Sequence, residues 1–123
     1  MSGPGGIGGE LRLPAHLLDA AALRQRTIAA NLANQSTPGW KRLEVTFEAA
    51  LGEALERGGT REALEVEPRV QVDESAPARL DGNSVDAEQE LVEMSRNALL
   101  YHTLTRAAAA KVSQLRAAIT GRP

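Results

Sequence analysis

Apolar residues recur at helical spacing in two long stretches, one near each end of the chain. From about Ala15 to Asn34 the sequence is rich in Ala, Leu, Arg and Gln, and its apolar positions are three or four residues apart. From Ala87 to Ile119, alternating four- and three-residue steps select a second stripe that is apolar at nine of ten positions. The first stretch predicts an amphipathic helix, and the second predicts a longer helix with a coiled-coil seam.

Local signals predict where these helices end and begin. The segment Thr37–Trp40 reads Thr-Pro-Gly-Trp. Pro38 disfavours helical geometry at the residue before it, and Gly39 suits the position of positive φ in a type II turn. Asp86, followed three residues later by Gln89, predicts the N-cap of the last helix in the manner of a capping box.

The segment between the helices has mixed signals. Glu44 to Arg57 fits a short helix with its larger apolar residues on one face. Leu64 to Val72 alternates apolar and polar residues, which favours short strands or extended segments. Asp73 to Asn83 contains Pro, Gly and many polar residues and predicts a loop.

The length of 123 residues argues for one structural domain. We expect a mainly α fold whose N- and C-terminal helices form a coiled-coil-like bundle, with a short irregular, β-containing middle segment. Its parts are a flexible glycine-rich leader (1–14), an N-terminal helix with its Thr-Pro-Gly turn (15–43), an acidic middle segment (44–85) and a C-terminal coiled-coil helix (86–123).

Composition makes a self-sufficient core doubtful. Leu, Ile, Val and Phe total 27 residues, whereas alanine, which contributes little on burial, occurs 21 times. A helix from Asp86 to Ile119 would be roughly 50 Å long, and no other part of the chain is large enough to cover it. We therefore expect both terminal helices to pair with each other and then with helices of other subunits.

Charge is distributed unevenly along the chain. Residues 1–43 carry a formal charge of +3, residues 44–93 carry −10 and residues 94–123 carry +5. This pattern favours a partner with the opposite arrangement, or copies packed end against middle. The basic residues are spaced out and aromatic residues are few, so we do not expect nucleic-acid binding.

The sequence offers no arrangement for catalysis, a cofactor or a metal. Cysteine is absent, and His16 and His102 have no second ligand at metal-binding spacing. The glycine pattern of residues 3–8 follows no strand, and no serine lies in a nucleophile elbow. Apolar runs do not exceed four residues, so we expect neither a membrane span nor a Sec-type signal peptide.

One motif resembles a known family signature. Flagellar basal-body rod proteins and their hook relatives carry Asn-(Ile/Leu)-Ala-Asn, two residues, Thr-Pro-Gly, an aromatic residue and often a basic one. The chain reads Ala30-Asn31-Leu32-Ala33-Asn34-Gln35-Ser36-Thr37-Pro38-Gly39-Trp40-Lys41. Trp40 stands where Tyr is usual. The short length, and Gly82-Asn83-Ser84-Val85-Asp86 before the last helix, look like the proximal-rod members of the family.

The resemblance implies a structural subunit of the proximal rod, which would polymerise through its terminal helices into part of the drive shaft and export channel. It implies a location in the periplasmic rod of the basal body, reached through the flagellar type III export apparatus. Expected partners are further copies of the chain, other rod subunits, the MS-ring protein and the adaptor at the rod base. Another rod or hook-junction subunit, and a soluble helical adaptor or chaperone, remain alternatives.

Two groups of residues are the candidate sites. The motif residues are expected to form the turn, with the two asparagines capping or bridging the end of the first helix or lying solvated at the surface. These residues are Asn31, Asn34, Thr37, Pro38, Gly39 and Trp40. The second group is expected to form the helical seam within and between subunits. It comprises Leu18, Ile28, Leu32, Leu91, Met94, Tyr101, Val112, Leu115 and Ile119.

Overall fold

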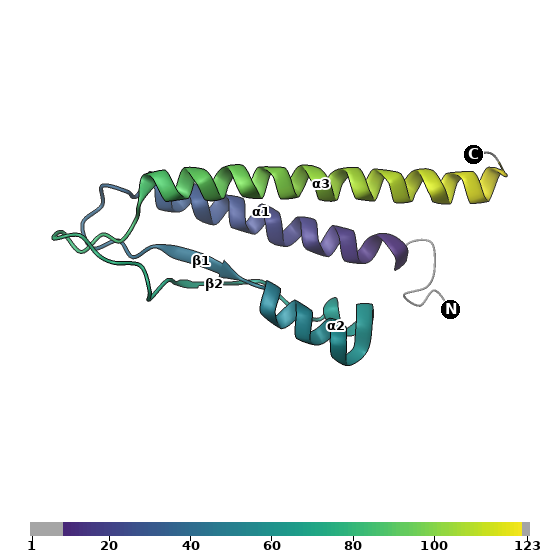
Figure 1. Cartoon of the computed structure of the whole chain (residues 1–123), viewed down its shortest axis with the longest axis horizontal. Coiled ribbons are helices and arrows are strands. Elements are labelled where there is room, and N and C mark those ends of the chain that lie inside the picture. Colours follow the sequence, from purple (N-terminus) through teal and green to yellow (C-terminus); the bar gives the residue numbers. More distant parts are fainter. Residues whose placement is uncertain (1–8, 122–123) are drawn as a thin grey trace.

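The computed structural model describes residues 9–121 and is dominated by two long helices (Figure 1). The elements in chain order are η1 (Gly9–Leu11), α1 (Arg12–Ala33), β1 (Leu43–Thr46), α2 (Glu48–Ala63), β2 (Arg69–Val72) and α3 (Ala87–Thr120). The expected mainly α class is confirmed, because two paired terminal helices precede and follow, in sequence, a short middle segment with one two-stranded sheet.

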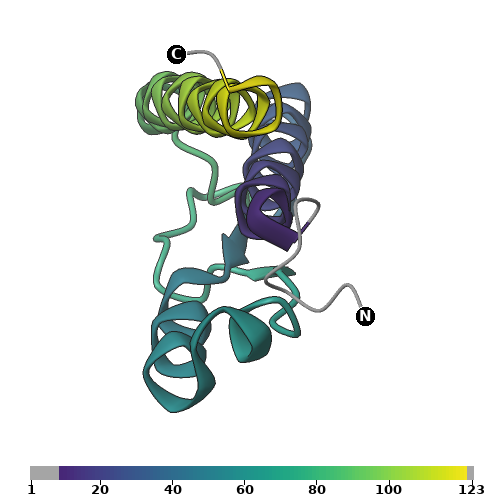
Figure 2. The same cartoon turned by 90° about the vertical axis from the view of Figure 1, so that its right-hand side faces the viewer.

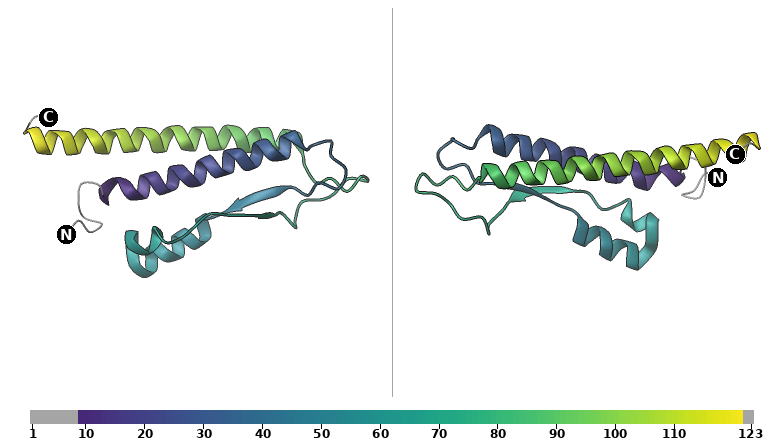
Figure 3. Two further views of the ribbon diagram at one scale, coloured as in Figure 1. Left: turned by 180° about the vertical axis from the view of Figure 1, so that it is seen from behind. Right: turned by 45° about the horizontal axis from the view of Figure 1, so that its top comes forward.

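Helices α1 and α3 pack side by side in antiparallel directions (Figure 3). Near the start of α3, Asn31 of α1 donates to Glu90, and near its end Lys111 pairs with Glu10 of η1 at 3.4 Å. The 34 residues of α3 span about 50 Å at 1.5 Å per residue, whereas the 22 of α1 span about 33 Å. The C-terminal end of α3 therefore extends beyond α1, as Figure 1 shows.

Both ends of α3 are capped. Asp86 has extended backbone geometry, and its carboxylate accepts from the N–H groups of Glu88 at 3.0 Å and Gln89 at 3.3 Å. This is the N-cap role that its place in the sequence predicted. Gly121 ends the helix in the left-handed conformation at φ 70°.

The start of α1 differs from the prediction. The helix begins at Arg12 instead of about Ala15, and a 3₁₀ turn, η1, precedes it. Pro14 falls in the first helical turn, where its missing N–H costs no intrahelical hydrogen bond. The expected flexible leader was therefore wrong for residues 9–14, and its residues 1–8 lie outside the described part of the chain.

The middle segment also corrects the prediction. Glu44 to Thr46 do not begin a helix, because they belong to β1, which pairs with β2 in antiparallel register from Leu43 opposite Val72 to Thr46 opposite Arg69. The helix starts only at Glu48 and continues past Arg57 to Ala63, with a kink at Gly59, where φ is 65°. Of the segment from Leu64 to Val72, which was expected to form short strands or extended structure, only Arg69–Val72 forms a strand, β2.

The sheet and α2 lie on the side of α1 that faces away from α3, as the end-on view shows (Figure 2). His16 of α1 donates through Nε2 to the carbonyl of Val66 at 2.5 Å, and its ring meets that of Phe47 edge to face, with centroids 5.5 Å apart. Arg24 of α1 pairs with Glu48 at the start of α2. These contacts attach the α2 arm to the helical pair.

The buried core of the described residues is small, and its six polar members outnumber its three large apolar ones. Its apolar residues are Ala20, Ala21, Ile28, Phe47, Ala54, Ala63 and Val85. Its polar residues are Thr27, Asn31, Asn83, Ser84, Glu90 and Asn97. Burial of alanine contributes little, so polar contacts hold the elements in place where a larger domain would use Leu and Ile.

Candidate functional site

The motif after α1 folds into the turn that its sequence predicted. Trp40 N–H donates to the carbonyl of Thr37 at 3.2 Å, closing a four-residue turn. Gly39 has φ 77°, which is the geometry of the third position of a type II turn. Asn34 caps α1 with ordinary negative φ, so the left-handed geometry that Asn tolerates is not used here.

A second loop, residues 79–85, lies against this turn and is clasped to it by backbone and side-chain hydrogen bonds. Buried Asn83 donates through Nδ2 to the carbonyls of Asn34 and Thr37, each at 2.8 Å. Gly39 N–H donates to the carbonyl of Asp81 at 2.9 Å, so the turn and the loop each donate hydrogen bonds to the other. We call residues 34–42 and 79–85 together the clasp.

The clasp requires a close approach of two backbones. Gly82 has φ 83°, and a Cβ built on it would lie 3.3 Å from Cα of Gly39. Lys41 donates through Nζ to the carbonyl of Gly82 at 2.8 Å, and Ser84 N–H donates to the carbonyl of Trp40 at 3.0 Å. Glycine at position 82 thus supplies both the conformation and the space that the contact needs.

Asn31 connects the clasp to the helical pair. Its side chain is fully buried, and Oδ1 accepts from Leu43 N–H at 2.9 Å and from Trp40 Nε1 at 3.3 Å. Its Nδ2 donates to the Leu43 carbonyl at 2.8 Å and to Glu90 Oε2 at 3.4 Å. One side chain therefore ties α1 to β1, to the turn aromatic and to α3.

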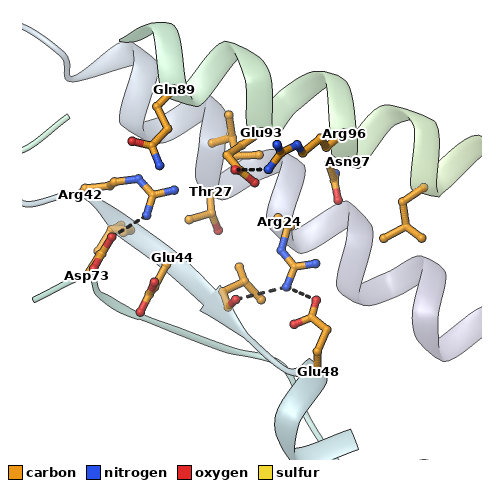
Figure 4. A pocket seen from close by; sticks show the side chains of 14 residues that line it. Arg24, Thr27, Arg42, Glu44, Glu48, Asp73, Gln89, Glu93, Arg96 and Asn97 are labelled. Carbon is orange, nitrogen blue, oxygen red and sulfur yellow. Dashed lines mark hydrogen bonds and ion pairs between the residues drawn. The ribbon is translucent and has the colours of Figure 1, made fainter. Parts of the chain in front are cut away.

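Arg42 and two carboxylates form a charged cluster beside Asn31. Arg42 donates through Nε to Glu90, whose side chain is completely buried, and through Nη1 to Asp73 at 2.9 Å. Figure 4 shows Arg42 reaching Asp73 at one end of the pocket between α1, β1 and α3. Arg42, directly before β1, thus joins Asp73, directly after β2, to Glu90 of α3.

The charges in this cluster stabilise one another. Burial disfavours the cation of Arg42, but hydrogen bonds and the charges of Glu90 and Asp73 outweigh that cost and raise the pKa of Arg42. Hydrogen bonds from Ser75 lower the pKa of Asp73, and Arg42 adds to this effect against the opposing influence of burial. Both groups are therefore ionised at neutral pH.

Most of the other charged residues lining this pocket are also paired. Arg24 contacts Glu48 and the Val45 carbonyl, and Arg96 pairs with Glu93 at 3.4 Å (Figure 4). Glu44 forms no ion pair with the described residues and accepts a hydrogen bond from Gln71 at 3.3 Å. Within residues 9–121, no group of three His, Cys, Asp or Glu side chains could hold a metal ion.

The predicted seam residues fall into three classes. Ile28 is buried between the helices. Those of intermediate exposure are Leu18, Leu32, Met94 and Leu115. Those exposed on α3 are Leu91, Tyr101, Val112 and Ile119, with exposed fractions of 54, 45, 40 and 67%. The chain alone therefore covers only part of the predicted seam.

The stripe of α3 that faces α1 is offset from the predicted one and includes polar residues. Glu90 and Asn97 are buried there, although sequence periodicity selected their neighbours Leu91 and Ala98. Asn97 donates through Nδ2 to the Ala21 carbonyl at 2.8 Å, while its buried Oδ1 accepts no hydrogen bond from the described residues. Because both residues are polar, the spacing of apolar residues in the sequence does not select these positions.

The comparison with known protein families matches residues of α1 and of the signature turn. A family model described as flagella basal body rod protein matches residues 18–41, which contain most of α1 and the signature turn. The flagellar basal body rod protein FlgB of Borrelia hermsii is 35% identical over 106 residues, covering 72% of this chain and 78% of that protein. This chain belongs to the flagellar basal-body rod protein family.

Two further relatives extend the match beyond the signature. FlgB of Aeromonas hydrophila is 32% identical over 117 residues, covering 86% of this chain and 89% of that protein. FlgB of Escherichia coli is 30% identical over 110 residues, covering 74% and 78%. The expected resemblance is confirmed, and within the family this rod protein is similar to FlgB.

Membership settles the broad role of the chain. Proteins of this family are structural components of the flagellar basal-body rod, not enzymes, and they assemble with other rod components. No helix within the described residues has the length and apolar character needed to cross a membrane. The clasp and the helical pair are therefore structural sites, whose chemistry is packing and hydrogen bonding.

Proposed function

We propose that this rod protein polymerises through α1 and α3 to form part of the proximal rod, which serves as drive shaft and export channel. The observation that carries the proposal is the set of large apolar side chains that α3 leaves exposed. They are Leu91, Val92, Leu99, Leu100, Tyr101, Val112 and Ile119. An isolated helix with so many uncovered apolar groups is stabilised when neighbouring helices remove them from water.

The difference in length between the two helices supports the same assembly. Lys111 contacts η1, which precedes α1, so the residues of α3 that follow Lys111 extend beyond the N-terminal end of α1. Val112 and Ile119 lie in that extension and are exposed. A helix from an adjacent subunit would bury them and continue the antiparallel bundle along the rod axis.

The charge pattern gives the assembly an orientation. The last 30 residues carry five basic residues and no acidic ones, whereas residues 44–93 carry a net charge of −10. Packing the basic end of α3 near the acidic middle of another subunit is electrostatically favourable, while matched ends repel. We propose periplasmic placement after type III export, with the MS-ring protein, the rod-base adaptor and other rod subunits as neighbours.

The test places the chain in motile bacteria that lack their own copy of its gene. The wild-type chain should restore swimming and be recovered in purified basal bodies. Ile119→Asp adds a charge to an exposed apolar site and should abolish both, without changing the circular dichroism of the purified chain. Gln114→Asp, at an exposed position of the same helix, is the matched control.

Two results would contradict the proposal. One is wild-type swimming with Ile119→Asp at normal expression. The other is a purified chain that sediments as a small, defined, stably helical oligomer and is absent from basal bodies, which would favour a soluble adaptor. A pulldown against the MS-ring protein tests the proposed contact at the rod base separately.

A further inference from the structure

The most exposed large apolar side chain of the described residues lies in the clasp loop, away from the helical stripe. Leu80 is fully exposed, at 110% of its reference area, in the loop beside the signature turn. It occupies the second position of the turn Arg79–Gly82, which Gly82 N–H closes by donating to the carbonyl of Arg79 at 2.9 Å. A leucine in this position projects into water and gains nothing from the fold of its own chain.

The base of this turn is firmly held. Arg79 N–H donates to the Asn83 carbonyl at 2.8 Å, and its guanidinium donates to the carbonyls of Val85 and Gln35, each at 2.6 Å. Three hydrogen bonds on the residue before Leu80 therefore fix the direction of the loop tip. A side chain presented on such a base loses little further freedom when it binds.

A groove of matching chemistry lies between α1 and α3, near the middle of the molecule. Its volume is about 620 Å³, and its walls include Ala22 and Arg26 of α1 and Ala98, Tyr101, His102 and Thr105 of α3. Small alanine side chains leave room for a branched apolar group, and Tyr101 adds an aromatic wall. The groove lining includes the cation of Arg26 and no carboxylate.

The Leu80 side chain cannot occupy the groove of its own chain. Gln35, to which the loop is bonded, follows the end of α1, and Ala22 lies 13 residues before it, or roughly 20 Å along a helix. The occupant must therefore come from another molecule. Asp81, next to Leu80, accepts through Oδ1 from Asn83 N–H at 3.0 Å and lies 3.9 Å from Arg79 Nε, but its side chain is 40% exposed, and its charge complements that of exposed Arg26.

We propose that Leu80 of one copy inserts into the α1–α3 groove of a second copy, with Asp81 pairing with Arg26 of that copy. The proposal rests on the proposed function, because it names a contact between subunits of the same rod. The loop tip and the groove are different surfaces of one chain, so a copy whose groove is filled still has a loop tip to offer to the next copy. Repeated in one direction, such a contact propagates along a rod.

Engineered cysteines test this contact, because the chain has no cysteine of its own. Bacteria lacking their own copy of the gene would co-express two single variants, Leu80→Cys and Ala98→Cys, and their isolated basal bodies would be oxidised. We expect a disulfide-linked dimer at least tenfold more abundant than with Leu80→Cys and Thr103→Cys, since Thr103 is an exposed α3 residue outside the groove. Asp81→Asn or Arg26→Gln should reduce the yield several-fold.

The outcomes separate this contact from the proposed function. Incorporation of both variants with no specific dimer, or with Leu80→Cys linked to a different protein, overturns the contact while the rod assignment stands. If neither cysteine variant enters basal bodies but the wild-type chain does, two other variants, Leu80→Glu and Leu80→Met, test the contact. We expect both purified variants to have the melting temperature of the wild-type chain. Leu80→Glu should fail to enter basal bodies and Leu80→Met should enter them, whereas equal incorporation of the two refutes the contact. If the wild-type chain is also excluded, the proposed function fails, and the same oxidation on the concentrated purified chain then decides the contact.

Discussion

The most informative perturbation is removal of Arg42 from its buried cluster. In Arg42→Leu, Glu90 keeps only the 3.4 Å contact from Asn31, while its side chain remains fully buried. An uncompensated buried charge costs about 3–5 kcal/mol, a large part of the roughly 5–15 kcal/mol that stabilises an ordinary domain. We therefore expect Arg42→Leu to unfold at much lower temperature than the wild-type chain.

The double variant separates charge from packing. Arg42→Leu with Glu90→Leu removes both buried charges, and such replacements are often neutral or stabilising. Asp73 keeps its hydrogen bonds from Ser75, so little else is left unpaired. The double variant should therefore recover most of the stability that Arg42→Leu loses, with a coupling of about 2 kcal/mol or more.

Circular dichroism during urea unfolding is the assay, with a fixed concentration of a stabilising osmolyte so that the weakest variant retains a folded baseline. Glu90→Gln is the matched control, because it keeps the shape of Glu90 and removes its charge. If Arg42→Leu lowers the free energy of unfolding by less than about 1 kcal/mol, Glu90 is not left as an uncompensated buried charge. If the double variant loses as much free energy of unfolding as the two single variants added together, Arg42 and Glu90 are not coupled.

Four further predictions address separate parts of the molecule. Gly39→Ala should lower stability by about 1–2 kcal/mol through positive φ alone, since a Cβ there meets no atom within 4 Å, and Gly39→Asn should cost less in the same unfolding assay. The lowered pKa of Asp73 contributes stability that is present above its ordinary pKa of 3.8 and lost as pH falls through the lowered value, so Asp73→Asn should flatten the loss of unfolding free energy as pH falls below 3.8. Asn97→Leu removes a buried acceptor that has no partner among the described residues, together with the hydrogen bonds from Nδ2 to the Ala21 carbonyl and to Gln25 Oε1. We expect a higher melting temperature and a looser α1–α3 register, read from cysteine cross-linking between the helices; a lower melting temperature would show that the two hydrogen bonds outweigh the unpaired acceptor. Leu115→Asp should stop incorporation into basal bodies more than it reduces solubility, and normal recovery of this variant would contradict a seam that passes through it.

Features encoded by neighbouring residues were predictable from the sequence. The type II turn depends on Pro38 and Gly39, which act within four residues, and the N-cap of α3 depends on Asp86 and the two N–H groups that follow. Helix α3 itself follows from a repeat that continues for many turns. Such signals do not require knowledge of distant partners.

Features that join distant residues were not predictable. Asn83 contacts Asn34 across 49 positions, and Arg42 meets Glu90 across 48. A single buried polar residue in a helix has no periodic signal, so apolar spacing selected Leu91 and passed over its buried neighbour Glu90. Three of the four residues of β1, Glu44 to Thr46, were assigned to a helix, because an alternation of four residues does not identify a strand unless its partner β2 is known.

We propose that neighbouring subunits cover the apolar side of α3 in the assembled rod. The decisive measurement is maleimide labelling of Ile119→Cys, compared between the purified chain and isolated basal bodies. Thr60→Cys, exposed on α2, reports on general access to the rod. We expect rapid labelling at position 119 in the free chain and strong protection in the rod, whereas equal labelling of Ile119→Cys in both states would show that no subunit covers this side of α3.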